Sequence, residues 1–152
     1  MMTFDLDVSG LLDDAEQLAQ KAERATRPAA QAGAQVLYDQ VRANVDGLGR
    51  HTGNLASAIY QVYSASNSTD TRKVYHVSWN ARKAPHGHLV EYGYIKRLAS
   101  YIGRDGKWHT NKKVKLAAPK QVPGKAFVRR AESAIPAAEA AMQARFEEEM
   151  SK

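Results

Sequence analysis

Apolar residues recur at the spacing of an α-helix along the front of the chain, on both sides of Pro28. Ser9 precedes the pattern and is of a type that caps helices, and the glycine-rich run Asp46-Gly47-Leu48-Gly49 follows it. Because proline has no backbone N–H, we expect the helix to kink at Pro28 or to restart there. The apolar positions are Leu11, Leu12, Ala15, Leu18, Ala19, Ala22, Ala29, Ala32, Val36, Leu37 and Val41. Many are alanines, which bury little area each, so we expect a partner subunit to complete the core.

Alternating apolar and polar residues predict a β-hairpin in the middle of the chain. Its strands are residues 60–64 and 73–79, joined by the polar turn 66–71. His76 lies on the face of the second strand opposite Trp79. We interpret His76 as a surface or partner-contact histidine and not as a catalytic base.

Two further helices are predicted. A short one from Asn54 to Ile59 has Thr52 as its candidate cap, and a C-terminal one contains Pro136, where we expect a kink. Glutamates 147–149 lie at the negative end of the C-terminal helix, so this end should fray unless basic groups contact it. The apolar face of the C-terminal helix comprises Phe127, Ala131, Ile135, Ala138, Met142 and Phe146.

The stretch from Tyr94 to Gly124 has little periodicity, many lysines and interleaved aromatic residues. A structureless connection of about thirty residues is uncommon in a compact domain, so this stretch is either a functional arm or a hairpin. Asp105-Gly106 is a suitable hairpin tip. Together the elements predict an α+β fold, in which a small antiparallel sheet packs against long N-terminal and C-terminal helices. We expect one domain spanning residues 1–152, with residues 94–124 as a long basic arm.

The chain has 152 residues, 43% of them apolar, and no cysteine. The lack of cysteine excludes a disulfide framework, a thiolate nucleophile and cysteine-ligated zinc, and it fits a reducing cytoplasm. The acidic start does not have the basic and apolar regions of a secretory signal, and no apolar run approaches the length of a membrane span. We therefore expect a soluble protein with no membrane partner.

The formal net charge of +6 is unevenly spread along the chain. Residues 1–46 hold eight acidic and four basic side chains, whereas residues 82–130 hold thirteen basic side chains and only Glu91 and Asp105 as acidic ones. The front of the chain therefore suits positive surfaces and the middle suits negative ones. Those negative partners are either nucleic acid or the acidic front of a neighbouring copy.

Basic residues interleaved with aromatic ones also suit a groove for single-stranded nucleic acid. No recognised nucleic-acid-binding motif frames the arm, so we favour an arm that orders against another subunit. The residues that we expect at the interface with a subunit or partner are Asp13, Asp14, Arg97, Arg104, Lys107, Trp108, Lys112, Lys113 and Lys115.

The stretch from Ala84 to Tyr94 is the strongest candidate for chemistry, because it crowds histidines, a glutamate and tyrosines together. His86, His88 and Glu91 fall at offsets of two and three, which a strand and a turn could gather around zinc or iron. The spacing is weak evidence, since such a motif usually lies on an all-β barrel and this chain has long helices at both ends. The structural alternative anchors Leu89-Val90 in the core between two turns. We favour that alternative, with no catalytic residue, metal or cofactor.

The same stretch resembles a known family. Leu89-Val90-Glu91-Tyr92-Gly93 resembles the "apolar, Glu, aromatic, Gly" signature of the tail-completion or neck proteins of long-tailed bacteriophages, also called phage tail components. Thr52-Gly53-Asn54-Leu55, followed by Ile59, resembles a second family element, and Gly124 to Ala131 resembles the family's entry into the last helix. In that entry Ala126 replaces the expected proline, and the segment before it is unusually long and basic. The positions that carry the motifs are Gly53, Leu55, Leu89, Glu91, Gly93, Phe127, Arg129 and Arg130.

The resemblance implies a structural virion protein of the bacteriophage neck, assembled in the cytoplasm of the bacterial host. It would complete the tail and join it to the head connector as part of a homo-oligomeric ring. Its partners would be other copies of itself, the head-tail connector, and the tail terminator or tail tube proteins, with non-specific contact to DNA in the lumen as a further option. The alternatives are a basic DNA-binding module and a His/Glu metalloenzyme. Because a carboxylate at the edge of a core needs a partner, we expect Glu91 to pair with Arg129 or Arg130 and to fix the turn at Gly93.

Overall fold

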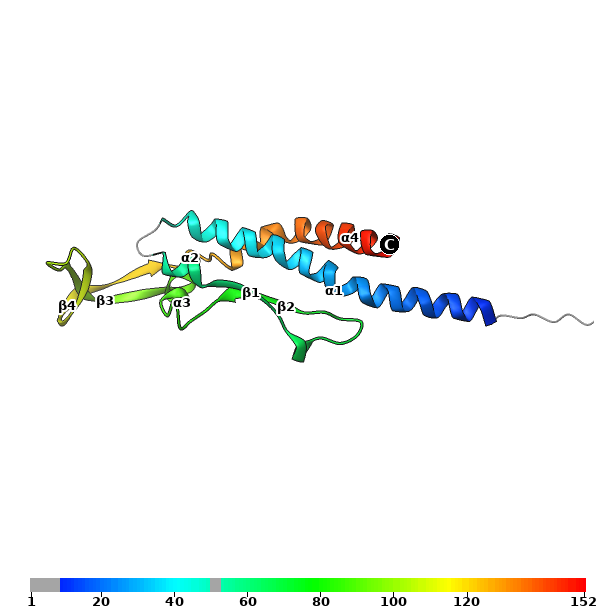
Figure 1. The fold of residues 1–152 in the computed structure, drawn as a ribbon. Helices are drawn as coiled ribbons and strands as arrows, with labels where there is room; N and C mark the ends of the chain where they lie inside the picture. The colour runs from blue at the N-terminus through cyan, green and yellow to red at the C-terminus, as the bar shows by residue number, and fades with distance from the viewer. Residues whose placement is uncertain (1–8, 50–52) are drawn as a thin grey trace, which may run out of the picture.

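The computed structural model describes residues 9–49 and 53–152 of the chain. It has an α+β fold, 53% helical and 26% strand, which confirms the predicted fold class. The described part is elongated, with a two-stranded hairpin at one end and the start of the first helix at the other (Figure 1). Thr52, the expected helix cap, lies outside the described residues.

The first helix, α1 (Ser9–Asp46), passes through Pro28 without a break. Ala25 and Ala29, on either side of the proline, are buried at 1% and 5% exposure. Packing of this face compensates for the backbone hydrogen bond that Pro28 cannot donate. The alternative in which a second helix restarts at Pro28 is therefore wrong.

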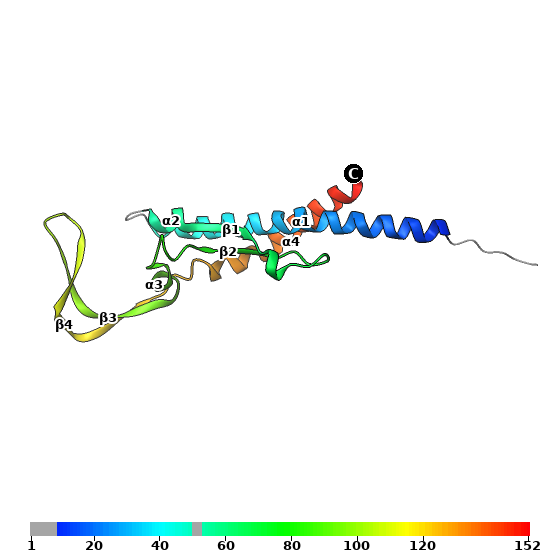
Figure 2. The ribbon, with the colours of Figure 1, turned by 60° about the horizontal axis from the view of Figure 1, so that its bottom comes forward.

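The last helix, α4 (Ile135–Ser151), runs antiparallel to α1 and packs along it (Figures 1 and 2). The two helices approach closely at Gly33, where an added Cβ would overlap the side chain of Met142. A 3-10 helix, η2 (Arg129–Ala134), leads into α4, so the prediction of one continuous helix from Phe127 is wrong in its first turns. Pro136 lies in the first turn of α4, where an N–H would have no helical partner, and the predicted kink is wrong.

A short helix, α2 (Asn54–Ala58), leads into a sheet of two antiparallel strands, β1 (Ile59–Tyr63) and β2 (Tyr75–Trp79). A 3-10 turn, η1 (Ala65–Asn67), follows β1, and the strands agree with the predicted hairpin to within two residues. The sheet contacts α1. The ring of Trp79, the last residue of β2, meets the ring of Phe127 edge-on, with centroids 5.5 Å apart. The buried core cluster comprises Val41, Val45, Ala56, Ile59, Phe127 and Ala131.

Residues 93–123 form a second antiparallel pair that extends away from the body as a long hairpin (Figure 2). Its strands are β3 (Gly93–Ile102) and β4 (Trp108–Pro123). The register shifts twice, on either side of Leu98, so that β4 carries extra residues that the shorter β3 does not pair. Gly106 adopts φ 70° in the turn, which confirms Asp105-Gly106 as the tip. The basic arm thus has the form of a hairpin, one of the two alternatives that we expected.

The stretch between β2 and β3 contains a short helix, α3 (Gly87–Tyr92), and not the strand and turn that the metal-site alternative required. Gly87 lets α3 pack on Trp79, because an added Cβ would overlap the indole ring. Val90 packs against the core, whereas Leu89 is 36% exposed. The expectation that Leu89 anchors the segment in the core is therefore wrong.

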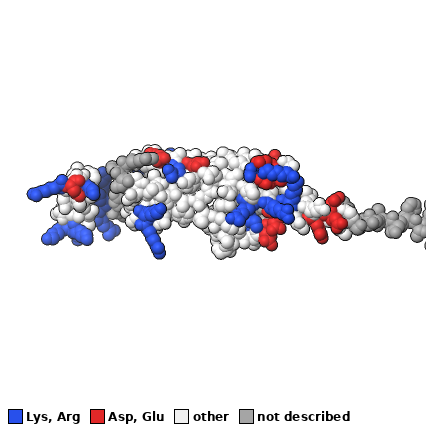
Figure 3. All heavy atoms as spheres, in the orientation of Figure 1, with Lys and Arg blue, Asp and Glu red and all other residues white. Residues whose placement is uncertain are grey.

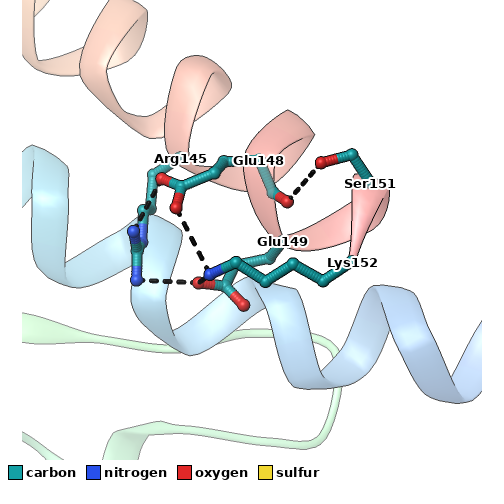
Figure 4. Close-up of polar contacts among 5 residues, drawn as sticks. All are labelled: Arg145, Glu148, Glu149, Ser151 and Lys152. Atoms are coloured by element: carbon teal, nitrogen blue, oxygen red, sulfur yellow. Dashed lines mark hydrogen bonds and ion pairs between the residues drawn. The ribbon is translucent and has the colours of Figure 1, made fainter.

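The end of α4 carries a network of ion pairs (Figure 4). Arg145 contacts Glu148 and Glu149 at 2.6 and 2.7 Å, and Lys152 contacts the same carboxylates at 3.3 and 2.8 Å. Hydrogen bonds from Arg145 and then from Lys152 hold the pKa of Glu148 below its usual value. The hydrogen bond to Glu149 raises the pKa of Lys152. The basic groups that this acidic helix end requires therefore come from Arg145 within α4 and from Lys152, which caps its C-terminus.

Candidate functional site

Glu91, near the end of α3, is a buried carboxylate with 1% exposure. Its Oε2 accepts the backbone N–H of Val128 at 2.9 Å, and its Oε1 accepts the backbone N–H of Arg129 at 3.2 Å. The Nε of Arg129 lies 3.3 Å from the same Oε1 and forms an ion pair with it. Glu91 therefore joins α3 to the backbone that leads into η2, and Arg129 is its arginine partner. Arg130 instead donates its backbone N–H to the carbonyl oxygen of Ala126.

Two glycines allow a close approach of the backbone beside Glu91, at the start of β3 and just after the end of β4. Gly93 has φ 84° and ψ 177°, a region that is essentially restricted to glycine. A Cβ on Gly93 would lie 2.5 Å from the carbonyl oxygen of Val122, and a Cβ on Gly124 would overlap the carbonyl oxygen of Glu91. A larger residue at Gly93 would push β3 and β4 apart at the base of the hairpin, and one at Gly124 would push the chain after β4 away from the end of α3.

The segment after the hairpin is tied to α3 through its backbone. Lys125 donates its N–H to the carbonyl oxygen of Val90 at 2.7 Å, and Ala126 donates its N–H to that of Glu91 at 3.1 Å. Ala126 has φ 48°, whereas the ring of proline fixes φ near −65°. Proline could neither adopt this φ nor donate the N–H to Glu91, whereas alanine does both at the cost of a left-handed conformation.

The three residues considered as metal ligands serve other purposes or lie apart. Both oxygens of Glu91 are engaged by backbone N–H groups, as described above. His86 precedes α3 and lines an apolar groove, and His88 is exposed. Within residues 9–49 and 53–152, no group of three or more His, Asp or Glu side chains is arranged to hold a metal ion.

The groove beside His86 has a volume of about 460 Å³ and lies at the base of the hairpin. The end of α1, together with α2, α3 and the two strands of the hairpin, contributes its walls. His86 contributes an imidazole ring to the groove, and Lys125 contributes an ammonium group. Most of the other lining residues are apolar. Side chains that define it are Val45, Leu48, Leu55, Leu89, Tyr94 and Val122. The sequence did not reveal this groove, because its walls come from segments far apart in the chain.

The hairpin of residues 93–123, which we call the basic hairpin, has eight basic residues and one acidic residue. The basic residues expected at an interface are all exposed on it, as is Trp108 at 67%. These basic positions are Arg97, Arg104, Lys107, Lys112, Lys113 and Lys115. At the tip, a hydrogen bond to His109 and then one to the backbone of Lys107 hold the pKa of Asp105 below its usual value.

The opposite end of the molecule is acidic. Residues 9–20 of α1, which we call the acidic front, contain Asp13, Asp14 and Glu16 and no basic residue. Both aspartates are exposed, and the apolar Leu12 and Leu18 are exposed at 61% and 59%. Figure 3 shows the blue basic end and the red acidic end at opposite extremes of the described chain. The structure therefore does not bring the two sets of predicted interface residues together within one copy.

The remaining motif residues have local structural roles. Gly53 caps α2 with φ 73°, a left-handed conformation that favours glycine. Leu55 packs against the core cluster, and Phe127 is fully buried within it. Packing and backbone geometry therefore explain why glycine stands at position 53 and apolar residues stand at positions 55 and 127 of the motifs.

Comparison with known proteins supplies the family. No curated protein and no solved structure matches the chain significantly. In the part of the chain that the structure describes, no helix has the combination of length and apolar character needed to cross a bilayer. Residues 9–93, more than half of the chain, match the family of the bacteriophage HK97-gp10 tail component, and this span runs from the start of α1 to Gly93. The chain therefore belongs to the HK97-gp10 family of bacteriophage tail components.

Proposed function

We propose that this protein is a structural component of the bacteriophage neck, which completes the tail and joins it to the head connector as one copy in an oligomeric ring. Membership of the tail-component family supports a structural role in the virion. The observation that carries the finer proposal is the separation of charge between the acidic front and the basic hairpin, at opposite ends of an elongated molecule (Figure 3).

Opposite charge at the two ends favours contact between unlike surfaces of neighbouring copies. Such a head-to-tail contact leaves one acidic and one basic end free after each addition, and the assembly closes into a ring when the rotation between copies permits it. An exposed ion pair contributes only about 0–1 kcal/mol, so several pairs must act together. The eight basic residues of the hairpin and the three acidic residues of the front provide such a set.

The tip of the basic hairpin also carries exposed apolar and aromatic side chains. Tyr101, Ile102 and Trp108 are exposed at 53%, 60% and 67%. Aromatic residues are enriched at protein interfaces, where they bury a large area with few rotatable bonds. This tip supports contact with a further virion protein, for which we propose the head connector, the tail terminator or the tail tube.

The test is complementation of a phage that cannot make this protein. We expect electron micrographs of the defective lysate to show DNA-filled heads and tails that are not joined, and the wild-type gene supplied in trans to restore joined particles. Tails of normal length with normal head attachment in the absence of the protein would contradict the neck role.

The alternative function is a basic DNA-binding module, which the exposed charge and aromatic residues of the hairpin favour. A mobility shift with short duplex DNA at several salt concentrations separates the two. Non-specific binding is typically weaker than about 10⁻⁶ M at physiological salt. Clearly tighter binding under those conditions would favour the DNA-binding module, whereas the neck proposal predicts weak, steeply salt-dependent binding.

We further propose that the protein is not an enzyme. Glu91, the carboxylate considered for metal chemistry, is engaged by two backbone N–H groups and by Arg129. Metal analysis of the purified protein tests this proposal. Stoichiometric metal that is lost in the Glu91→Gln variant would revive the metalloenzyme alternative.

A further inference from the structure

The apolar face of α1 extends beyond its partners within the same copy. Ala25 and Ala29 on this face are buried. Leu18 and Ala15, about two and three turns before Ala25 on the same face, are exposed. Leu18 lies beside the end of α4, sharing a shallow cleft with Glu149 and Lys152. The helix continues past that end toward its N-terminus (Figures 1 and 2). The acidic front thus continues a packed face of the fold into solvent.

The groove at the base of the hairpin is the complementary feature. It is mostly apolar and open, and its side chains Leu89 and Tyr94 are exposed at 36% and 42%. Lys125 lines it, and the basic hairpin extends directly from it. A helix with one apolar face and acidic flanks has the chemistry that this groove accepts.

We compare the two ends of the molecule as occupants of the groove of another copy, because each end carries exposed apolar residues and the two ends differ in charge. The tip of the basic hairpin carries Tyr101, Ile102 and Trp108, but its cationic side chains would be placed beside Lys125 and the base of a second basic hairpin. Residues 9–20 carry Leu18 together with three carboxylates and no cation, while Lys21, Arg24 and Lys152 line the cleft that Leu18 shares with the end of α4. Like charges oppose association and unlike charges favour it, so the acidic front is the better occupant.

The occupant must come from a second copy. The groove lies at the hairpin end of the molecule, and the acidic front lies at the other end (Figures 1 and 3). A contact between two different surfaces of identical chains is heterologous, as a ring requires.

We propose that the acidic front of one copy docks as a helix in the groove of the next, with Leu18 and Ala15 against the apolar walls and Asp13 and Asp14 toward Lys125 and the basic hairpin. This inference rests on the proposed oligomer and assigns both of its contacting surfaces. The apolar half of the contact supplies the tight packing, and the charged half selects the partner end and its orientation.

Cysteine cross-linking tests the contact directly, because the chain has no cysteine of its own. Leu18→Cys in one copy is mixed with Leu89→Cys in an isotope-labelled copy, and the mixed disulfide is measured by mass spectrometry. The matched controls pair Leu89→Cys with Glu23→Cys, which lies on another side of the same helix and outside the cleft of Leu18, and with Trp108→Cys at the hairpin tip. All four positions are exposed, so the fold should tolerate each change.

We expect the Leu18 and Leu89 pair to cross-link at least five times more than either control. We also expect Leu18→Gln to weaken self-association by about tenfold in sedimentation experiments, because an apolar anchor is lost, and Glu23→Gln to change it less than about twofold. Equal cross-linking of all pairs, dominance of the Trp108 pair, or a protein that remains monomeric would overturn the docking. The complementation experiment is independent of these results, so a failed docking test leaves the neck proposal to be judged on its own.

Discussion

Replacement of Glu91 by glutamine tests whether this carboxylate holds α3 to the start of η2. The glutamate has two acceptor oxygens, which receive the N–H groups of Val128 and Arg129. An amide has only one acceptor oxygen, and its NH₂ group would face the other donor. Glu91→Gln therefore keeps the size of the side chain and removes one acceptor together with the negative charge.

The magnitude follows from these contacts. A partly buried N–H left without an acceptor costs about 1–3 kcal/mol, and hydrogen bonds to a charged group are roughly twice as strong as neutral ones. We therefore expect the free energy of unfolding to fall by about 3 kcal/mol, which corresponds to roughly 6–12 °C in melting temperature for a chain of this size. The ion pair contributes little of this, because the side chain of Arg129 is 59% exposed.

The assay is urea-induced unfolding at a fixed protein concentration, followed by circular dichroism and by tryptophan fluorescence. Arg129→Gln is the matched control, because it removes the ion pair and leaves both backbone hydrogen bonds to Glu91 intact. We expect it to lower the free energy of unfolding by no more than about 1 kcal/mol. A loss below about 1 kcal/mol in Glu91→Gln, or equal losses in the two variants, would refute the assignment of Glu91 as a backbone acceptor.

Three further predictions concern the hairpin. Reversing Lys112, Lys113 and Lys115 to Glu should impair assembly, and reversing the aspartates of the acidic front to Lys in the partner copy should partly restore it; normal particle yields with the lysines reversed would contradict the charge pairing. Gly93→Ala should lower the free energy of unfolding by about 2 kcal/mol or more, because a positive φ and a close carbonyl oxygen both oppose the added Cβ. Gly106→Ala, at a positive φ but in open space, should lower it by about 1 kcal/mol. Equal losses in urea unfolding would contradict the close approach at Gly93. Limited trypsin digestion of the free protein should cut the basic hairpin first, since it extends from the body with few packed neighbours, and first cleavage within α1 would count against this.

Local sequence patterns were sufficient for elements that such patterns determine. These patterns all depend on residues that are near neighbours in sequence. They are the helical spacing of apolar residues in α1, the alternation of apolar and polar residues in β1 and β2, and the Asp-Gly pair at the hairpin tip. The α+β class followed from these elements. An arginine partner for Glu91 was also predictable, because a single carboxylate between apolar residues needs a partner, but its two backbone N–H donors were not predicted.

Other features depend on contacts that the sequence does not show. α3 has six residues, less than two turns, and at that length helical and strand periods cannot be distinguished. In the basic hairpin, two register shifts interrupt the alternation that would have identified its strands. Pro136 fits either a kink or the first turn of a helix, and only the 3-10 segment before it decides between them. The groove escaped prediction because five separate elements form it.

The most direct test of the proposed function is a cryo-EM map of the virion at the junction of head and tail. The proposal predicts a ring of copies between the connector and the tail tube, in which the acidic front of each copy lies in the groove at the base of the next copy's basic hairpin. A map that resolves the whole junction without this chain, or that shows it elsewhere in the tail, would contradict the proposal.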